Sequence, residues 1–455
     1  MCKSTRVFVL SFILLALTFY ASAGYGQVTC GETYLFQGDS RADRFGRAVS
    51  GAGDVDNDGY DDVIIGAWGN DAGGPDAGQA YIYSGQTGAV IHTIIGTGFG
   101  DNVGWSVSDF TDVNTDGHAD VIIGARDAGG TGEAYVISGI DGSILHTFTG
   151  VVADDKFGFS VSGAGDVNMD GRIDLIVGAP SPAPGNPGNA YIYSGLDYSE
   201  LYAFSGEAAD DGFGRSVACA GDVNNDGYDD VIVGADLNDA GGSDAGRAYV
   251  YSGQDGSLLH TFTGEATQNF FGFDVDGGVD LDTDGFPDLI VGATGAAGTG
   301  KTYAFSGQDG SLLYDLTGEA VDDEFGRAVS GTGDLTGDGI PELIIGAKFN
   351  DAGDNNAGRV YIHSGFDGTL LHVFTGQGIR RNLGTDVSSA GDVNRDGVDD
   401  IIIGGPRRGA GLARVYTCLS PGVIPTLTDI GAVIFGALLL VSIVLYVRRR
   451  SVQHA

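Results

Sequence analysis

Basic residues are scarce in this chain of 455 residues: 23 Lys and Arg stand against 61 Asp and Glu, a formal net charge of −38. Such a chain repels nucleic-acid phosphates and anionic lipid headgroups, so we expect no nucleic-acid partner. The 10 prolines, and 80 glycines without a three-residue period, exclude collagen. Hydrophobic residues at 42% and aromatic residues at 10% exclude a disordered acidic chain, so a folded, turn-rich core is expected.

The N-terminus has the pattern of a secretory signal. Lys3 and Arg6 precede a short apolar run over residues 7–17, and the small residues at 21–23 form a cleavage site. The run is short for a bilayer-spanning anchor helix, which is the alternative. We therefore interpret residues 1–23 as a signal peptide for the Sec pathway.

The C-terminus has the pattern of a membrane anchor. Residues 430–447 form 18 consecutive apolar or small positions, and residues 448–455 begin with three arginines. This length spans a bilayer, and the arginines favour a cytoplasmic tail. A buried core helix is disfavoured because such helices are seldom apolar on every face. The sequence predicts a single transmembrane helix.

The segment before this helix, residues 421–429, contains Ile424-Pro425-Thr426-Leu427. Together with the apolar helix and the basic tail, this tetrapeptide resembles the IPTL-type C-terminal sorting signals of bacterial surface proteins. The sequence departs from that pattern at Asp429-Ile430, where the family tends to carry Trp-Gly after an acidic residue. The resemblance implies attachment to a bacterial membrane or cell surface and a sorting protease as a partner.

Between the two ends, over residues 24–420, one unit recurs seven times. Its most regular part is an acidic loop of nine residues, first seen at 54–62, and successive copies start 54 to 58 residues apart. Each copy holds four short apolar segments without helical period, as at 157–165, 175–179, 190–193 and 201–204. The second segment is apolar on both faces, which a strand requires only when both faces are covered. The sequence predicts an all-β fold, a seven-bladed β-propeller of four-stranded blades.

The ends of the repeat region predict how the ring closes. The first copy is preceded by residues 33–38, which align with a fourth strand, whereas the last copy stops after its third strand. The N-terminal strand would therefore complete the seventh blade. In this alignment Cys30 and Cys418 occupy the two sides of one hairpin turn, and we predict a disulfide between them in an oxidising compartment.

The acidic loops have the composition of calcium sites. Positions 1, 3, 5 and 9 carry oxygen side chains, position 6 is Gly, and position 7 offers a backbone carbonyl, an arrangement of hard donors that favours Ca²⁺. The candidate ligands are Asp54, Asp56, Asp58, Tyr60 and Asp62; Asp112, Asn114, Asp116, His118 and Asp120; Asp166, Asn168, Asp170, Arg172 and Asp174; Asp222, Asn224, Asp226, Tyr228 and Asp230; Asp280, Asp282, Asp284, Phe286 and Asp288; Asp334, Thr336, Asp338, Ile340 and Glu342; and Asp392, Asn394, Asp396, Val398 and Asp400.

Competing interpretations of the loops are weaker. An EF-hand needs a bidentate Glu at position 12, where the first copy has Ile65. Simple hairpin turns favour the same residue types but need no acidic ninth position. We expect the sixth loop to bind most weakly, because Thr336 replaces an acid or amide and Glu342 lengthens position 9. Seven Ca²⁺ would reduce the formal charge from −38 to −24.

The repeats resemble a known family. Phe45-Gly46, the acidic loop and Ile65-Gly66-Ala67 resemble the FG-GAP repeat of integrin α-subunit propellers, and the pattern covers residues 31–418. The second and seventh copies have Val103-Gly104 and Leu383-Gly384 in place of Phe-Gly. The resemblance implies that the acidic loops lie on the lower face of the ring and that partners bind the opposite, upper face.

These patterns predict a calcium-binding extracellular adhesion or binding module for a protein or glycan. Alternatives are a hydrolase or lyase that uses the central channel, and a structural envelope component. We expect no enzyme, because four of the seven His recur at one repeat position. The upper-face connections vary in length, as ligand-contacting loops would, and three of them carry Asn-Asp-Ala-Gly, as at Asn70–Gly73. Two interpretations are open for the acidic loops before Phe-Gly, such as Glu207–Asp211: they contact a basic or metal-bridged ligand, or they only solubilise the chain. Trp68 and Trp105 are either binding aromatics or packing residues.

Overall fold

The structure is a computed structural model of the whole chain. It describes residues 28–40, 42–181, 183, 185–406 and 410–419. The predicted signal peptide, IPTL segment, transmembrane helix and basic tail lie outside the described residues. In the portion described, no helix has the length and apolar character that a membrane span requires.

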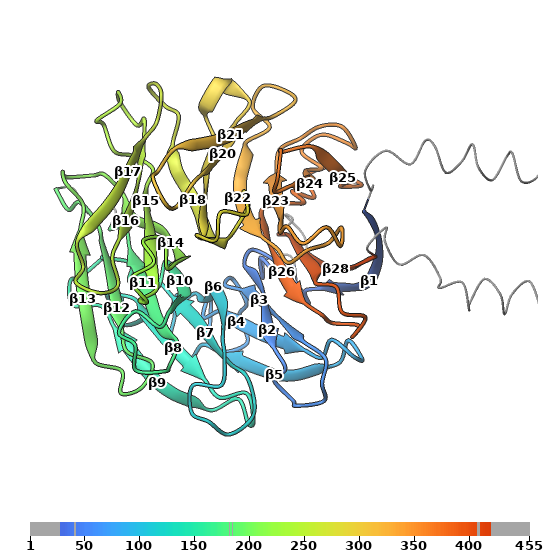
Figure 1. Cartoon of the computed structure of the whole chain (residues 1–455). Coiled ribbons are helices and arrows are strands. Elements are labelled where there is room, and N and C mark those ends of the chain that lie inside the picture. The colour runs from blue at the N-terminus through green and yellow to red at the C-terminus, as the bar shows by residue number, and fades with distance from the viewer. Residues whose placement is uncertain (1–27, 41, 182, 184, 407–409, 420–455) are drawn as a thin grey trace, which may run out of the picture.

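Seven antiparallel sheets of four strands surround a central axis (Figure 1). Short apolar segments separated by Gly- and Asp-rich turns favour strands over helices, because turn residues interrupt any helical period. The helical elements among the described residues are two three-residue 3₁₀ turns, η1 (Ala128–Gly130) and η2 (Ala296–Gly298). The structure confirms the predicted seven-bladed propeller.

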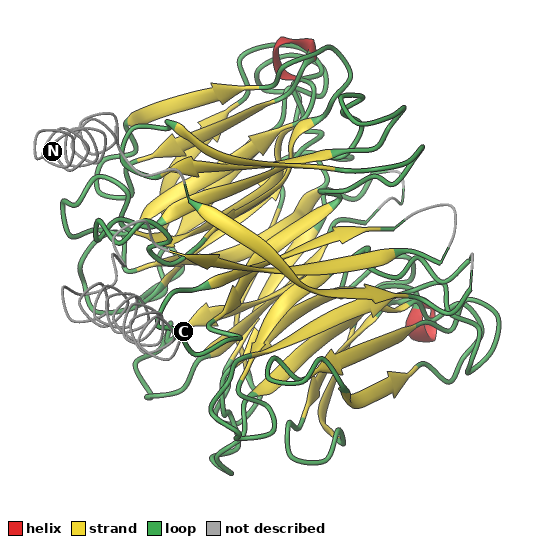
Figure 2. Ribbon diagram, turned by 90° about the vertical axis from the view of Figure 1, so that its right-hand side faces the viewer, coloured by secondary structure: helices red, strands yellow, loops and turns green. Residues whose placement is uncertain are grey.

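Each blade consists of an inner strand beside the axis, a second, a third and an outer strand (Figures 1 and 2). The inner strands are β2 (Val49–Gly53), β6 (Val103–Phe110), β10 (Ser160–Gly165), β14 (Phe213–Gly221), β18 (Phe271–Val279), β22 (Phe325–Gly331) and β26 (Asp386–Gly391). The second strands are β3 (Asp62–Ala67), β7 (Asp120–Ala125), β11 (Asp174–Ala179), β15 (Asp230–Ala235), β19 (Asp288–Ala293), β23 (Glu342–Ala347) and β27 (Asp400–Gly405).

The third strands are β4 (Gln79–Tyr83), β8 (Glu133–Ile137), β12 (Asn189–Tyr193), β16 (Arg247–Tyr251), β20 (Lys301–Phe305), β24 (Arg359–Ser364) and β28 (Leu412–Leu419). The outer strands are β5 (Val90–Ile95), β9 (Ile144–Thr149), β13 (Glu200–Ser205), β17 (Leu258–Thr263), β21 (Leu312–Thr317), β25 (Leu370–Thr375) and β1 (Thr29–Gln37).

The second strand of every blade is the centre of the hydrophobic core. All six residues of β3 are buried, as are those of the other second strands. Each second strand is covered on both faces because neighbouring blades stack against it. The prediction that this strand is apolar on both faces is confirmed.

Glycines allow neighbouring blades to approach closely. A Cβ atom on Gly234, in the second strand of the fourth blade, would overlap the carbonyl oxygen of Gly272 in the next blade. The same contact recurs between all neighbouring blades, including the last and the first, where Gly404 lies against Gly46. These crossings explain why both repeated glycines are required.

One substitution tests this packing. We expect Gly234→Ala to destabilise the fold by about 3 kcal/mol, because the added methyl group forces two backbones apart. Gly31→Ala is the matched control, since nothing lies within 4 Å of a Cβ at that exposed position, and we expect an effect within about 0.5 kcal/mol. Chemical denaturation measures both values. Equal stabilities of the two variants would contradict the close approach.

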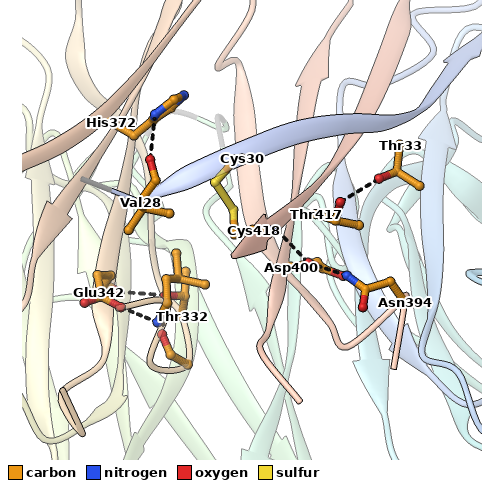
Figure 3. Close-up of a disulfide and its surroundings, with 12 residues drawn as sticks. Val28, Cys30, Thr33, Thr332, Glu342, His372, Asn394, Asp400, Thr417 and Cys418 are labelled. Atoms are coloured by element: carbon orange, nitrogen blue, oxygen red, sulfur yellow. Dashed lines mark hydrogen bonds between the residues drawn. A yellow bond between two sulfur atoms is a disulfide. The ribbon is translucent and has the colours of Figure 1, made fainter. Parts of the chain in front are cut away.

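The ring closes as predicted. Strand β1 pairs with β28, and Cys30 lies opposite Cys418, to which it is joined by a disulfide (Figure 3). The hydroxyl of Thr33 donates a hydrogen bond to the Thr417 hydroxyl at 2.9 Å in the same strand pair. The N-terminal strand is therefore held to the seventh blade by backbone pairing and by a covalent bond.

Candidate metal centres

All seven acidic loops lie at the same end of the ring. Each loop joins an inner strand to the second strand of its own blade. The inner strands all run in the same direction along the axis. Their loops therefore emerge together on one face, which we call the lower face. The connections between second and third strands lie on the opposite, upper face.

Hydrogen bonds from the backbone hold the first carboxylate of each loop. In the first loop, the Asp58 and Gly59 backbone amides donate to the Asp54 carboxylate at 2.9 and 2.8 Å. The Tyr60 amide donates to the Asp58 carboxylate at 3.0 Å. The second, third, fourth and seventh loops repeat these contacts. The loop is thus built around its own acidic side chains.

The ninth position is buried and connects the loop to the rest of the blade. Asp62 accepts hydrogen bonds from the amides of Val55 and Gly85, each at 2.8 Å. Burial raises the pKa of this carboxyl to about 7. The same cause raises the pKa of Glu342 and of Asp400 to about 8. A bound cation would offset this desolvation of the anionic form.

Three loops bring three carboxylates together. Their oxygen atoms lie within 4.8 Å of one another in each of three sets: Asp54, Asp56 and Asp58; Asp280, Asp282 and Asp288; and Asp334, Asp338 and Glu342. In the first set, burial and then the charges of Asp58 and Asp54 raise the pKa of Asp56. Four other loops have Asn at position 3, which contributes an amide oxygen in place of the third carboxylate.

Two predicted ligand atoms are buried without a hydrogen-bond partner. They are Oδ1 of Asp280, in the fifth loop, and Oε1 of Glu342, in the sixth. Glu342 uses its other oxygen to accept a hydrogen bond from the Leu335 amide at 2.6 Å. A buried oxygen without a partner is costly, and a cation would satisfy it. The residues of these loops therefore fit a hard divalent cation.

Side chains at position 7 connect neighbouring loops, which the sequence did not reveal. A ring nitrogen of His118 forms a hydrogen bond with the Val55 carbonyl at 2.7 Å. Arg172 donates to the Asp112 carbonyl at 3.4 Å. The residue chosen for its backbone carbonyl thus uses its side chain to hold the preceding loop in place.

The Asn-Asp-Ala-Gly loops of the upper face have a structural role. Asn238 donates to the Asp211 carboxylate at 2.8 Å, and Asn350 donates to the Asp323 carboxylate at 2.6 Å. Both amides are buried and lie 27 residues along the chain from their partners. The Asn residues are therefore used to hold two loops together and are not displayed to a ligand.

Polar side chains in the central channel join neighbouring inner strands. Asp274 accepts hydrogen bonds from the Ser216 hydroxyl and the Val329 amide, each at 2.8 Å. Asp386 accepts one from the Val49 amide at 2.8 Å. These contacts replace the backbone pairing that inner strands of adjacent blades lack.

The repeated histidines also have partners in the next blade. His92 and His260 form hydrogen bonds with the carbonyl oxygens of Gly139 and Gly307, at 2.6 and 2.9 Å. His372 similarly contacts the Val28 carbonyl at 3.1 Å (Figure 3). Their recurrence in the sequence therefore follows from repeated contacts between blades.

A pH experiment tests the burial of Asp386. Burial, and then the charge of Asp274, raise its pKa from 3.8 to about 7, although Arg47 and Arg327 oppose the shift. The folded chain therefore loses stability as pH rises from about 4 through about 7, because the half-buried, desolvated carboxyl must ionise. Asp386→Asn removes the charge and keeps an oxygen for the Val49 amide. We expect this variant to melt above the wild type at pH 8, with the difference shrinking at pH 5; a difference independent of pH would contradict the assignment.

Comparison with known proteins agrees with this architecture. The FG-GAP repeat model matches residues 45–83, 157–193, 213–251 and 325–363, which are parts of the first, third, fourth and sixth blades. The second, fifth and seventh blades have the same four-stranded arrangement in the structure. The chain therefore contains FG-GAP repeats within a complete seven-bladed ring.

Integrin alpha chains are similar to this chain over part of its length. Integrin alpha-5 of Xenopus laevis is 37% identical over 231 residues, which cover 46% of this chain and 22% of that protein. Integrin alpha-8 of Mus musculus is 33% identical over 189 residues, covering 37% and 17%. Integrin alpha-6 of Gallus gallus is 35% identical over 166 residues, covering 33% and 15%. The matches thus span about a fifth of the length of these relatives.

Proposed function

We propose that this chain is a calcium-stabilised extracellular propeller that binds a protein or glycan ligand on its upper face. The observation that carries the calcium assignment is the pair of buried, unpartnered ligand oxygens in the fifth and sixth loops. Ca²⁺ accepts six to eight oxygen ligands in flexible geometry, whereas Mg²⁺ usually retains several waters and rarely uses all-protein cages. Up to seven ions would neutralise carboxylates that otherwise repel.

A binding role is favoured over the two alternatives. The carboxylates Asp274 and Asp386 in the channel are engaged by backbone amides, which does not favour a hydrolase or lyase. The similarity to integrin alpha chains supports a surface binding module over a purely structural envelope component. Binding of the full chain to a glycan array and to extracellular proteins, with Ca²⁺ and with EGTA, tests this function. Calcium-independent or absent binding would contradict it.

We also propose the route by which the chain reaches its place of action. A Sec signal over residues 1–23 and a helix over residues 430–447 would leave the propeller outside a bacterial membrane. The IPTL segment would present the chain to a sorting protease. Cell fractionation of the full chain, and of a variant that lacks residues 421–455, tests the anchor. The truncated chain should appear in the medium, and its retention in the membrane would contradict the proposal.

The sixth loop offers a test of the ligand positions. Thr336 has a hydroxyl where other loops have a carboxylate or amide, so this site should be the weakest. We expect Thr336→Asp to strengthen the weakest calcium-binding step by about tenfold, because affinity rises with the charge of the ligands. Calorimetric titration with CaCl₂ measures the change. An unaltered weakest step would show that position 3 of this loop does not bind the ion.

A further inference from the structure

A ring of three arginines, three aromatic residues and one threonine surrounds the upper mouth of the channel. It is formed by the residue that follows each Phe-Gly pair or its equivalent at the start of an inner strand. In chain order these residues are Arg47, Trp105, Phe159, Arg215, Phe273, Arg327 and Thr385. All seven line a cavity of about 200 Å³. We call these residues the mouth ring.

The guanidinium groups of the mouth ring stack on its aromatic side chains. Arg47 lies 5.1 Å from the centre of the Trp105 ring. Arg215 and Arg327 lie 4.4 and 4.2 Å from the centre of the Phe273 ring. Stacking fixes the planes of these groups while their N–H edges keep their capacity to donate.

Two of the three arginines form no ion pair with any residue that the structure describes. Within the described part of the chain, neither Arg47 nor Arg327 forms an ion pair within 4 Å, and Nε of Arg327 is buried without a hydrogen bond. Arg215 is 3.8 Å from Asp236. Burial, and then the charges of Arg47 and Arg215, lower the pKa of Arg327 to about 9. Such a concentration of positive charge is unexpected in a chain with a net charge of −38.

Three carboxylates line the same cavity, and two of them, Asp274 and Asp386, attract the arginines of the ring. Asp274 and Asp386 lie one residue further along their inner strands, and their oxygens accept hydrogen bonds from backbone amides. Asp276 similarly accepts from the Gly331 amide at 2.8 Å. Burial raises the pKa of Asp276 and of Asp386 to about 7, which reduces their negative charge near neutral pH.

The positions of the arginines around the axis indicate the shape of the ligand. Arg47, Arg215 and Arg327 come from the first, fourth and sixth blades, so they are nearly evenly spaced around seven blades. Three donors spaced in this way match the three terminal oxygens of a tetrahedral oxyanion ester, whereas a planar carboxylate presents only two. Arginine is also the side chain best suited to such oxyanions.

We propose that the mouth ring binds the sulfate or phosphate monoester of a ligand, with Arg47, Arg215 and Arg327 donating to its three terminal oxygens. The proposal rests on the binding function proposed above and names the chemical class that the upper face recognises. Trp105 and Phe159, which are half-buried and line the same cavity, would contact the apolar body of that ligand.

The two tryptophans of the chain report on this site directly. Trp68 lies 5.2 Å from Trp105, and Trp105 contacts Arg47, so tryptophan fluorescence arises at the mouth. The full chain with CaCl₂ is titrated with sodium sulfate, sodium phosphate, glucose 6-sulfate, glucose 6-phosphate and glucuronate, at constant ionic strength set with NaCl. We expect tryptophan fluorescence to change saturably with sulfate, with phosphate and with at least one of the two esters. Comparison of the two ester titrations then shows whether the site prefers a sulfate or a phosphate group.

Variants identify the groups responsible. Arg47→Gln and Arg327→Gln should each weaken ester binding by about tenfold or more, as expected for loss of a charged hydrogen bond. Arg247→Gln, whose side chain pairs with Glu207 outside the ring, is the matched control and should leave binding unchanged. Calcium-dependent melting equal to that of the wild type confirms that the variants fold.

Three results would overturn the inference. The first is a fluorescence change with the esters no greater than that with NaCl. The second is equal ester affinity of the wild type and the Arg47→Gln and Arg327→Gln variants. The third is glucuronate binding as tight as ester binding. Calcium binding measured on the same samples shows whether a failure lies in ester binding or in the proposed calcium-dependent function. Ester binding can fail while calcium still stabilises the chain, and calcium binding can fail while the arginines still bind the ester.

Discussion

Removal of calcium is expected to lower the melting temperature of this chain by roughly 10–20 °C. Each site occupied at a hundred times its dissociation constant contributes about 2.7 kcal/mol, and several sites act on one ring. Without cations, the carboxylates gathered in the first, fifth and sixth loops repel one another. Differential scanning calorimetry in 1 mM CaCl₂ and in excess EGTA measures the shift in melting temperature. The shift grows with the fraction of calcium sites that are occupied.

Magnesium provides the control for this prediction. Excess MgCl₂ added to the EGTA-treated chain should restore little of the lost stability, because Mg²⁺ dehydrates reluctantly and requires stricter octahedral geometry. Excess CaCl₂ should restore all of it. A melting temperature unaffected by EGTA would show that the loops are ordinary hairpin turns.

Loss of the disulfide is the second large effect. Cys30→Ser combined with Cys418→Ser should destabilise the fold by about 4 kcal/mol, because the bond closes a loop of 388 residues in the unfolded chain. The remaining contacts of the closing strand, such as the ion pair of Arg414 with Glu32 at 2.7 Å, are partly exposed and weaker. Denaturant unfolding measures the change.

Reduction of the wild-type chain is the matching experiment. A reducing agent should lower the stability of the wild type to that of the double variant and should not affect the variant, in which only Cys219 of the described cysteines remains. A further loss in the variant would indicate that the reducing agent acts elsewhere. A double variant as stable as the wild type would contradict closure of the ring by this bond.

Much of the fold follows from the sequence because the repeats reveal it. One acidic loop, such as that at 54–62, would be an ambiguous turn, but seven at a regular spacing define both the blades and their number. The incomplete last copy and the extra strand before the first predict the closing pair of β1 and β28. The alignment of Cys30 with Cys418 then follows from the register.

Other features depend on contacts that no local pattern encodes. The hydrogen bond between Asn238 and Asp211 joins two loops of the upper face. In the sequence, each of the two residues looks like an ordinary polar loop residue. Arg47, Arg215 and Arg327 lie more than a hundred residues apart in the chain and meet only because the ring closes. A comparison of one position across all copies would have revealed these three arginines beside three aromatic residues.

The calcium content of the purified chain shows whether the seven acidic loops bind calcium. Native mass spectrometry of the full chain in CaCl₂, after removal of loosely associated ions, counts the ions bound per molecule. We expect up to seven Ca²⁺ per molecule. One of them should be lost first as calcium is lowered, and the Thr336→Asp variant should retain it better. A chain that retains no Ca²⁺, or that binds Mg²⁺ equally well, would contradict the calcium assignment.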